Sequence, residues 1–296
     1  MCIVALKYFK EVGFCGVKSR DRNYKPNVII KQSTRKGIER MLLWDEKTKW
    51  TEGLNEFGVA ILSSAVAVKK DEKEGSVATD EQGPFMSPDG KKIRTALFQK
   101  TPKKALTSCI DLELSGNTLI FDSETCFLLE GAFVDKKFNY KFKEIDKDQS
   151  VVRTNHGLMI ASGYKSDSDD KHIRIASKSS VSRMLRVRKD IKKVQSHLNL
   201  LDAISDVSNE DTQLNPLRKS ETHNKSILVT TGQIMICPKE LTMYYRPVWC
   251  DVELENFSDL NSEKSKTFFQ IISNRKLIQT NLEENSFVNF LKSSRL

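Results

Sequence analysis

The 296-residue sequence lacks any apolar run that approaches the roughly 18 residues of a membrane-spanning helix. It also lacks a secretory signal, because no charged region, apolar core and small-residue cleavage site follow one another at its start. Its six cysteines include no CxxC pair, and its four histidines have no spacing typical of metal ligands. We therefore predict a cytoplasmic chain with free thiols, no membrane partner, no metal and no cofactor.

The charge of the chain is basic, with a formal net charge of +9, which raises the question of nucleic-acid binding. Basic and acidic residues are interleaved in most places, and residues 183–193 form the most concentrated basic stretch. This stretch has the pattern of a helix, so it could contact phosphates or be a solvated helix face. The solvated face is the commoner case, and nucleic acid is not the partner that we predict.

The first seven residues contain the feature around which we interpret the rest of the sequence. Cys2 follows the initiator Met1, and methionine is usually trimmed before a small side chain. The new terminus would have a thiol and an α-amine on one residue, and the amine, with a pKa of roughly 7.7–8, can act as the thiol's base. Residues 3–6 are apolar and predict a buried strand that anchors this terminus. A chance Met-Cys start is the alternative.

A second strand over residues 12–17 is predicted to return beside the first as a hairpin. It brings a strongly charged segment to the end of the sheet where Cys2 lies. An N-terminal nucleophile needs a carboxylate to hold its amine, and Asp21 suits that role. It also needs a cation that favours the thiolate, and Lys18 or Arg20 suits this second role. An ordinary charged hairpin end is the alternative.

Two asparagines at turns are candidates for stabilising a developing oxyanion. Asn55 lies in a Gly-x-Asn-x-x-Gly turn before an apolar strand, where its amide N–H can point towards developing charge. Asn155 lies in a Thr-Asn-His-Gly sequence that follows a predicted strand at 150–153. Ordinary strand turns contain the same residue types, so both assignments stay open at this point.

The remaining pattern is one of many short strands with helices grouped between them, which is typical of α+β layers. Residues 69–92 are polar and charged and predict a mobile loop. Glu130 lies at the end of a predicted strand, where it either supports the site or is a surface carboxylate. The other expected elements are a strand at 27–32, a helical turn or strand at 36–43, a helix at 91–109 interrupted at Pro102, a hairpin at 117–130, a helix capped by Ser179 and Ser180 with apolar positions up to Ile204, a hairpin at 226–245, and a helical tail from Ser262 with an apolar stripe at Phe287, Phe290 and Leu291.

In their order, these motifs resemble those of the N-terminal nucleophile hydrolases, and most of all the branch with choloylglycine hydrolase, penicillin V acylase and acyl-coenzyme A:isopenicillin N acyltransferase. Residues 53–58 are similar to the Gly-Met-Asn-Glu-x-Gly motif of that branch, and residues 154–156 to the Thr-Asn-His of its acyltransferase-like members. Residues 179–183 resemble their Ser-Ser-x-x-Arg segment, and the hairpin at 226–245 resembles their closing strands. The resemblance covers about residues 2–250, and the order of the motifs makes it fairly specific.

This resemblance implies a four-layer αββα sandwich with antiparallel sheets over residues 1–255, and residues 256–296 are expected to be a mostly helical extension. It also implies hydrolysis or transfer of an acyl group at a linear amide bond, in a small-molecule N-acyl amide or acyl donor. Removal of Met1 is the only maturation that we expect, since no long propeptide precedes Cys2.

The roles of the site residues are implied by the same resemblance. Cys2 would be the nucleophile, its own α-amine the base, and Asp21 the group that orients the amine. Asn155 and Asn55 would form the oxyanion hole, and Arg183 would be a charged support.

The second strand departs from the family pattern at one position. The family commonly has Arg-x-x-Asp there, whereas this chain has a lysine, Lys18, three residues before Asp21. Lysine keeps the charge but loses the bidentate geometry of arginine, unless Arg20 takes over that role. We therefore predict a cysteine amidohydrolase or acyltransferase that works through an acyl-enzyme. The alternative is a catalytically inactive structural or binding protein of the same fold. For either function, a homo-oligomer is one option for the assembly of the chain.

Overall fold

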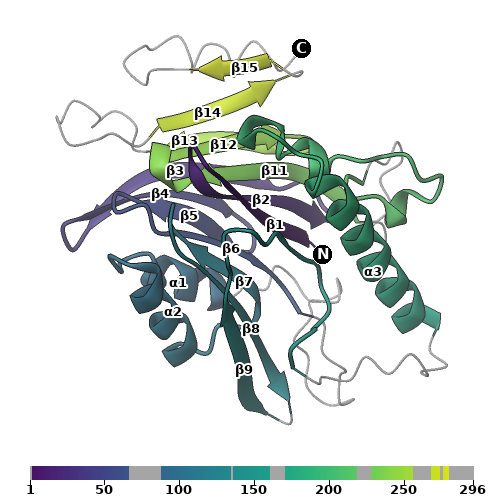
Figure 1. Cartoon of the computed structure of the whole chain (residues 1–296), viewed down its shortest axis with the longest axis horizontal. Helices are drawn as coiled ribbons and strands as arrows, with labels where there is room; N and C mark the ends of the chain where they lie inside the picture. Colours follow the sequence, from purple (N-terminus) through teal and green to yellow (C-terminus); the bar gives the residue numbers. More distant parts are fainter. Residues whose placement is uncertain are drawn as a thin grey trace.

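The computed structural model describes residues 2–66, 88–134, 136–160, 171–218, 228–255, 268–273 and 276–279. Within these residues, two sheets lie face to face between helices (Figure 1). Sheet A contains, in spatial order, β10 (Val151–Arg153), β1 (Cys2–Phe9), β2 (Gly13–Arg22), β11 (Val229–Cys237), β12 (Thr242–Pro247), β14 (Phe268–Ser273) and β15 (Lys276–Gln279). Sheet B contains β13 (Asp251–Glu255), β3 (Asn27–Arg35), β4 (Ile38–Asp45), β5 (Thr51–Asn55), β6 (Ala60–Ser64), β7 (Gly116–Phe121), β8 (Cys126–Val134) and β9 (Lys137–Glu144).

The helices cover the two outer faces of this pair of sheets. The α-helices are α1 (Pro88–Ala96), α2 (Pro102–Asp111) and α3 (Lys171–Ile191). Short 3₁₀ helices follow at η1 (His197–Asn199), η2 (Asp202–Ile204), η3 (Thr212–Leu214) and η4 (Pro238–Glu240). None of the helices in the described part of the chain has a segment long and apolar enough to cross a membrane.

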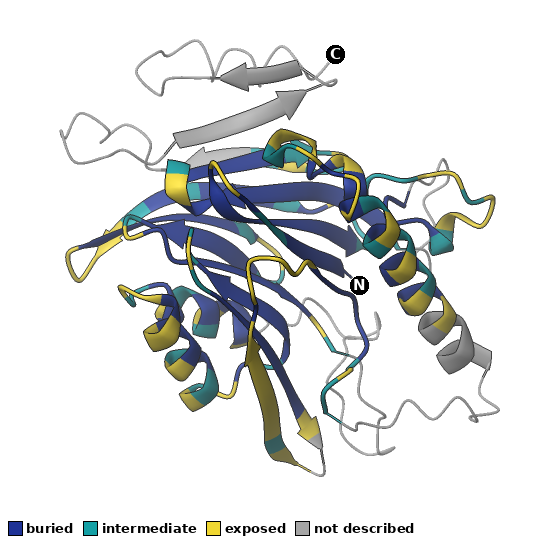
Figure 2. Ribbon diagram, in the orientation of Figure 1, coloured by how far each residue is buried: buried dark blue, intermediate teal, exposed yellow. Residues whose placement is uncertain are grey.

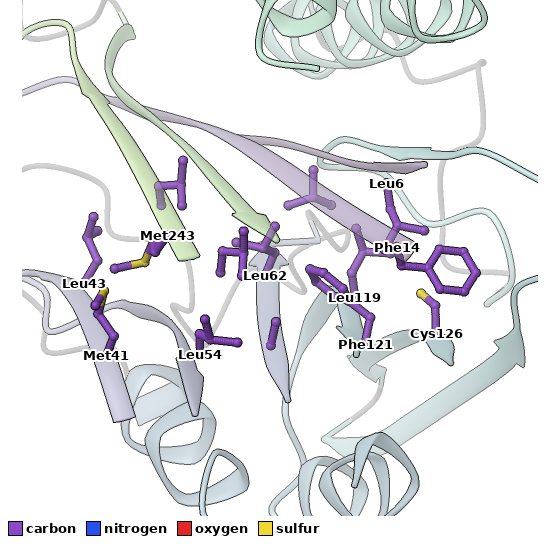
Figure 3. Packing of buried hydrophobic residues seen from close by; sticks show 14 of the residues in the cluster. Leu6, Phe14, Met41, Leu43, Leu54, Leu62, Leu119, Phe121, Cys126 and Met243 are labelled. Carbon is purple, nitrogen blue, oxygen red and sulfur yellow. The ribbon is translucent and has the colours of Figure 1, made fainter. Parts of the chain in front are cut away.

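Side chains of the central strands alternate between two apolar cores, as the two-residue period of a strand requires. On β1, Val4 and Leu6 point between the sheets, where they join a core that includes Phe14, Leu62 and Phe121 (Figure 3). The intervening residues of β1 face the opposite way, towards α3. Strands buried on both faces explain why the first strand is an almost continuous apolar run.

Close approach of the two sheets depends on a glycine in β2. A Cβ atom at Gly16 would lie 2.6 Å from the ring of Phe121, which belongs to the facing sheet. That separation is far inside van der Waals contact, so only glycine allows this packing.

The outer layers complete the four-layer arrangement. Met184 and Val187 of α3 pack on the outer face of sheet A, whereas Ile93 of α1 and Leu106 of α2 pack on the outer face of sheet B. Figure 2 shows the strands of both sheets mostly buried and the outward helix faces and strand β9 exposed. The predicted αββα architecture is therefore confirmed. The sheets are antiparallel except for the parallel pairs β12–β14 and β3–β13.

The register of sheet A brings three segments together at one end of β1. Cys2 lies directly opposite Arg20 of β2, and Val4 lies opposite Arg153 of β10. On the other side of β2, Thr230 of β11 lies opposite Asp21. The start of β1, the end of β2 and the turn after β10 therefore meet at one place.

Most of the predicted strands and the break at Pro102 are present, and of the two alternatives for 36–43 the strand is confirmed, as β4. Two expectations for the helix that contains Ser179 are corrected. Ser179 and Ser180 lie inside α3 instead of capping it, because the helix begins at Lys171, and it ends at Ile191, well before Ile204.

The tail contains strands where we predicted a helix. Residues 268–273 and 276–279 form the hairpin β14–β15, which pairs with β12 and extends sheet A. The apolar run in this segment is short and rich in isoleucine and phenylalanine, which favours a strand at an open sheet edge. The stripe at Phe287, Phe290 and Leu291 and most of the predicted loop at 69–92 lie outside the described residues. Strands β9 and β13 were not predicted.

Candidate active site

Cys2 begins β1 with its side chain on the face between the sheets, and only 5% of its surface is exposed. Its backbone nitrogen donates a hydrogen bond of 2.9 Å to Oδ1 of Asn155, in the turn after β10. The sulfur and the nitrogen of this residue therefore meet different surroundings, one between the sheets and one beneath α3.

Cations surround the sulfur. Burial by itself would raise the pKa of the Cys2 thiol. In the chain that still begins at Met1, the positive charges of Lys18, the amino terminus of residue 1 and Arg22 outweigh burial and lower that pKa to about 7, although the Asp21 carboxylate acts the other way. Nη1 of Arg22 lies 3.8 Å from the sulfur, within reach of a hydrogen bond. By contrast, burial raises the pKa of the Cys109 thiol to about 12.

The cations are fixed by carboxylates of the facing sheet. Lys18, Arg20 and Arg22 alternate along β2 and all point between the sheets. There Lys18 donates to Glu52, while Arg20 Nη1 lies 3.5 Å from the same carboxylate. Arg22 Nε donates to Oδ2 of Asp45 at 3.1 Å. Because each buried charge has a partner of opposite sign, the positive field at the thiol is held in a fixed geometry.

Asp21 points to the other face of sheet A, towards α3. Its Oδ2 accepts a hydrogen bond of 2.9 Å from Arg183 and lies 3.6 Å from Nη1 of Arg218, and its Oδ1 accepts a bond of 2.9 Å from Thr230. Nη2 of Arg183 also donates to Oδ1 of Asn155 at 3.3 Å. Burial and the neighbouring Arg218 lower the pKa of Arg183 to about 10, so the guanidinium stays charged near neutral pH.

The turn that carries Asn155 is fixed by a serine of α3. Oγ of Ser180 lies 2.7 Å from Oγ1 of Thr154 and 2.8 Å from Nδ1 of His156, and it accepts from the backbone N–H of Asn155 at 3.1 Å. Nδ2 of Asn117 donates to the carbonyl oxygens of Thr154 and His156 at 2.9 and 3.1 Å. All of these groups are buried, so the turn is a preformed part of the site.

The structure corrects the prediction for Asn55. Its Nδ2 donates to the carbonyl oxygens of Leu97 and Gln99 at 3.0 and 2.8 Å, and its Oδ1 accepts from the backbone N–H groups of Phe57 and Val59. Both amide hydrogens are engaged in fixing the β5–β6 turn to the segment after α1. In this arrangement Asn55 supplies no donor for an oxyanion.

Glu130 is fully buried, so the expectation of a surface carboxylate is wrong. Its two oxygens accept hydrogen bonds of 2.8–3.1 Å from three consecutive backbone N–H groups, those of Leu158, Met159 and Ile160. The carboxylate thereby fixes the segment that follows the Asn155 turn.

The structure thus brings together Cys2, Lys18, Asp21, Asn155 and Arg183 of the predicted residues. Arg20 lies on the same face of β2 as Lys18, and its guanidinium is directed at Glu52 and Asp45 of sheet B. Sequence reasoning missed several partners: Arg22, Asp45, Glu52, Ser180, Arg218 and Thr230. The alternation of charges from Lys18 to Arg22 was a signal that could have identified Arg22, because all three cations share one face of a strand.

With this arrangement described, the fold can be compared with known structures. The chain is similar to the mutant C2A conjugated bile acid hydrolase from Clostridium perfringens, with a TM-score of 0.50 and 12% identity over 96% of this chain and 95% of that chain. It is also similar to penicillin V acylase from Agrobacterium tumefaciens, with a TM-score of 0.44 and 12% identity over 94% of this chain and 98% of that chain. No protein-family model and no curated protein matches the sequence. The first similarity supports the predicted four-layer α+β sandwich fold.

Proposed function

We propose that this chain is a cysteine N-terminal nucleophile amidohydrolase, or an acyltransferase of the same mechanism, which acts on the linear amide bond of small N-acyl amides. The observation that carries the proposal is the position of Cys2. Its sulfur lies among cations that lower the thiol pKa to about 7, and its nitrogen donates to Asn155. Removal of Met1 converts that nitrogen into the α-amine that the mechanism requires.

The reaction has two steps. In the first, the α-amine takes the proton of the Cys2 thiol, the thiolate attacks the amide carbonyl carbon, and the C–N bond breaks as the proton passes to the leaving amine. In the second, water or an acceptor amine attacks the thioester, the α-amine takes its proton, and the C–S bond breaks. The proton returns to the sulfur, and a carboxylic acid or a new amide leaves.

Asn155 has two roles in the proposal: it holds the Cys2 nitrogen and it stabilises the oxyanion. Its Oδ1 accepts from the Cys2 nitrogen, and its Nδ2 donates one hydrogen to the carbonyl of Ala65 at 2.7 Å, which leaves a second hydrogen for a developing oxyanion. Arg183 and Asp21 are positioning residues in the proposal, because Arg183 of α3 donates to Asn155 and its guanidinium is held by the Asp21 carboxylate. Asp21 then orients the amine through this chain of contacts.

The substrate class rests on the similarity of fold. The similar protein is named as a hydrolase of conjugated bile acids, and by analogy we propose a small-molecule substrate for this chain. The six cysteines are free, which suits a reducing compartment, and we propose the cytoplasm. Residues 1–255 form the proposed catalytic unit, with the acyl and amine groups of the substrate still to be identified by screening.

The proposal is tested by trapping the acyl-enzyme. The mature protein is mixed with a panel of N-acyl p-nitroanilides and acylated amino acids, quenched in acid and examined by peptide mass spectrometry. We expect an acyl adduct on Cys2 and release of the amine. The Cys2→Ala variant should form no adduct, and Cys109→Ser, a change at another buried cysteine, should react normally. Turnover retained in Cys2→Ala would contradict the proposal, whereas a wild-type protein without adduct would favour the inactive scaffold.

A further inference from the structure

A second cluster of reactive side chains lies at the end of the β1–β2 hairpin away from Cys2. Cys15 of β2 lies opposite Lys7 in the register of the hairpin, five residues along β1 from the Cys2 position. The sulfur of Cys15 lies 3.1 Å from that of Cys237, at the end of β11. A ring nitrogen of His197 in η1 and a carboxylate oxygen of Glu240 in η4 complete the cluster with Cys237, all three ligand atoms lying within 4.8 Å of one another.

The separations in this cluster suit a tetrahedral ion. Nε2 of His197 and Oε1 of Glu240 are 3.5 Å apart. Two ligands at zinc bond lengths of about 2.0–2.2 Å, separated by the tetrahedral angle, lie about 3.4 Å apart. Two zinc-bound sulfurs lie about 3.8 Å apart by the same geometry, so Cys15 and Cys237 need to separate slightly for both to bind one ion.

The surroundings of the cluster orient its ligands. Tyr244 donates a hydrogen bond of 3.0 Å from its hydroxyl to Oε2 of Glu240, which fixes the carboxylate. The ring of Phe9 packs edge-on against His197 with centroids 6.3 Å apart. Cys237 is fully buried, while the side chains of His197 and Glu240 are 18% and 34% exposed. An ion can therefore enter from solvent on one side and meet a buried thiolate on the other.

We propose that Cys237, His197 and Glu240 bind a zinc ion, with the fourth coordination position on the side of Cys15. Thiolate and imidazole ligands favour zinc over calcium or magnesium, which take oxygen ligands. Binding releases the thiol proton of Cys237 to solvent. The ion ties the β11–β12 turn to the segment after α3, the helix that carries Arg183. The site is structural in this proposal, because it stands at the far end of the hairpin from Cys2.

The experiment measures zinc binding directly. The full chain is stripped with a chelator under a phosphine reductant and dialysed against Zn²⁺, and bound metal is counted by mass spectrometry. A Co²⁺ titration then reads thiolate coordination from its near-ultraviolet charge-transfer band. We expect one zinc per chain and a sulfur-to-cobalt band. Cys237→Ser should weaken binding about 100-fold or more, since even loss of an outer partner of a ligand costs roughly 10–100-fold.

Further variants test the other ligands one at a time. His197→Gln and Glu240→Gln change partly exposed residues, so a folding failure in Cys237→Ser leaves the test intact. Each should weaken zinc binding by at least about tenfold, and Cys109→Ser should not. Cys2→Ala should keep the zinc, which also separates this outcome from any result on catalysis. A wild-type chain that binds no zinc, or one whose zinc is lost with Cys2 instead of Cys237, would overturn the proposal.

Discussion

The nitrogen of Cys2 and the side-chain oxygen of Asn155 are joined by a hydrogen bond of 2.9 Å, although the two residues are 153 positions apart in the chain. This contact connects the start of β1 to the turn after β10. The same Asn155 oxygen accepts from Arg183, whose guanidinium is paired with Asp21. The proposed nucleophile is therefore linked, through its own backbone, to a buried ion pair beneath α3.

The first prediction concerns Asn155. Asn155→Ala removes both the acceptor for the Cys2 nitrogen and the proposed oxyanion donor, so we expect acyl-enzyme formation to slow by about 10²–10³-fold. Single-turnover kinetics with the best substrate of the screen measure this rate. Asn139→Ala, which changes an exposed asparagine of β9, is the control and should leave the rate unchanged. An equal rate of acyl-enzyme formation in both variants would show that Asn155 takes no part in the reaction.

The second prediction concerns the pH dependence of the thiol. A pKa of about 7 means that the thiolate fraction of Cys2 falls as the pH falls below 7, so the alkylation rate should decrease with a midpoint there. Arg22→Gln removes one cation and should raise this midpoint by about 1 unit. Stopped-flow labelling between pH 5 and pH 9, roughly the range in which thiols titrate, measures both midpoints.

The matched control for that experiment is Lys25→Gln, which removes an exposed lysine paired with Asp251. It should leave the midpoint in place. A wild-type midpoint near the ordinary thiol value, about 8.5, would mean that the cations around Cys2 do not activate it.

The third prediction concerns the buried carboxylate of Asp21. Asp21→Ala leaves Arg183 and Arg218 buried without their anion, so the free energy of unfolding should fall by about 3–5 kcal/mol. Urea unfolding followed by circular dichroism measures the loss. The control, Asp251→Ala, breaks an exposed pair and should cost less than about 1 kcal/mol. Similar losses of unfolding free energy in the two variants would show that the buried Asp21 carboxylate stabilises the fold no more than an exposed one does.

The fourth prediction concerns Ser180, which holds the Asn155 turn. Ser180→Ala leaves the buried N–H of Asn155 without its acceptor and should cost about 1–3 kcal/mol of unfolding free energy. Because the turn then loses its position, kcat should fall more than KM changes. Ser182→Ala, two residues along the same helix and partly exposed, is the control. A variant that loses stability but keeps kcat would limit Ser180 to a structural role.

The features of the site that the sequence revealed depend on local geometry. Cys2 and Asp21 could be placed together because a hairpin of two apolar runs fixes which ends meet. The Thr-Asn-His motif could be placed only through its resemblance to a family, since nothing local shows that β10 pairs with β1. Neither the hairpin geometry nor the family resemblance could identify Glu52 as a partner, because it reaches Lys18 from the other sheet.

The errors have physical causes as well. Asn55 has the residue type of an oxyanion donor, but its amide bonds backbone groups of its own turn and of the segment after α1, a use that the sequence pattern cannot distinguish. The serines of α3 looked like a helix start, yet Ser180 bonds across to the Asn155 turn. We predicted a helix for the tail because of its helical period, whereas residues 268–273 form a strand that pairs with β12 at the edge of sheet A.

The most direct test of the central claim is the intact mass of the purified native protein before and after a limited dose of a thiol alkylator, with peptide mapping of the label. We predict a chain that lacks Met1 and takes up the label first at Cys2, ahead of the buried thiols of Cys109 and Cys126. A chain that retains Met1, with Cys2 no more reactive than the other cysteines, would contradict the claim.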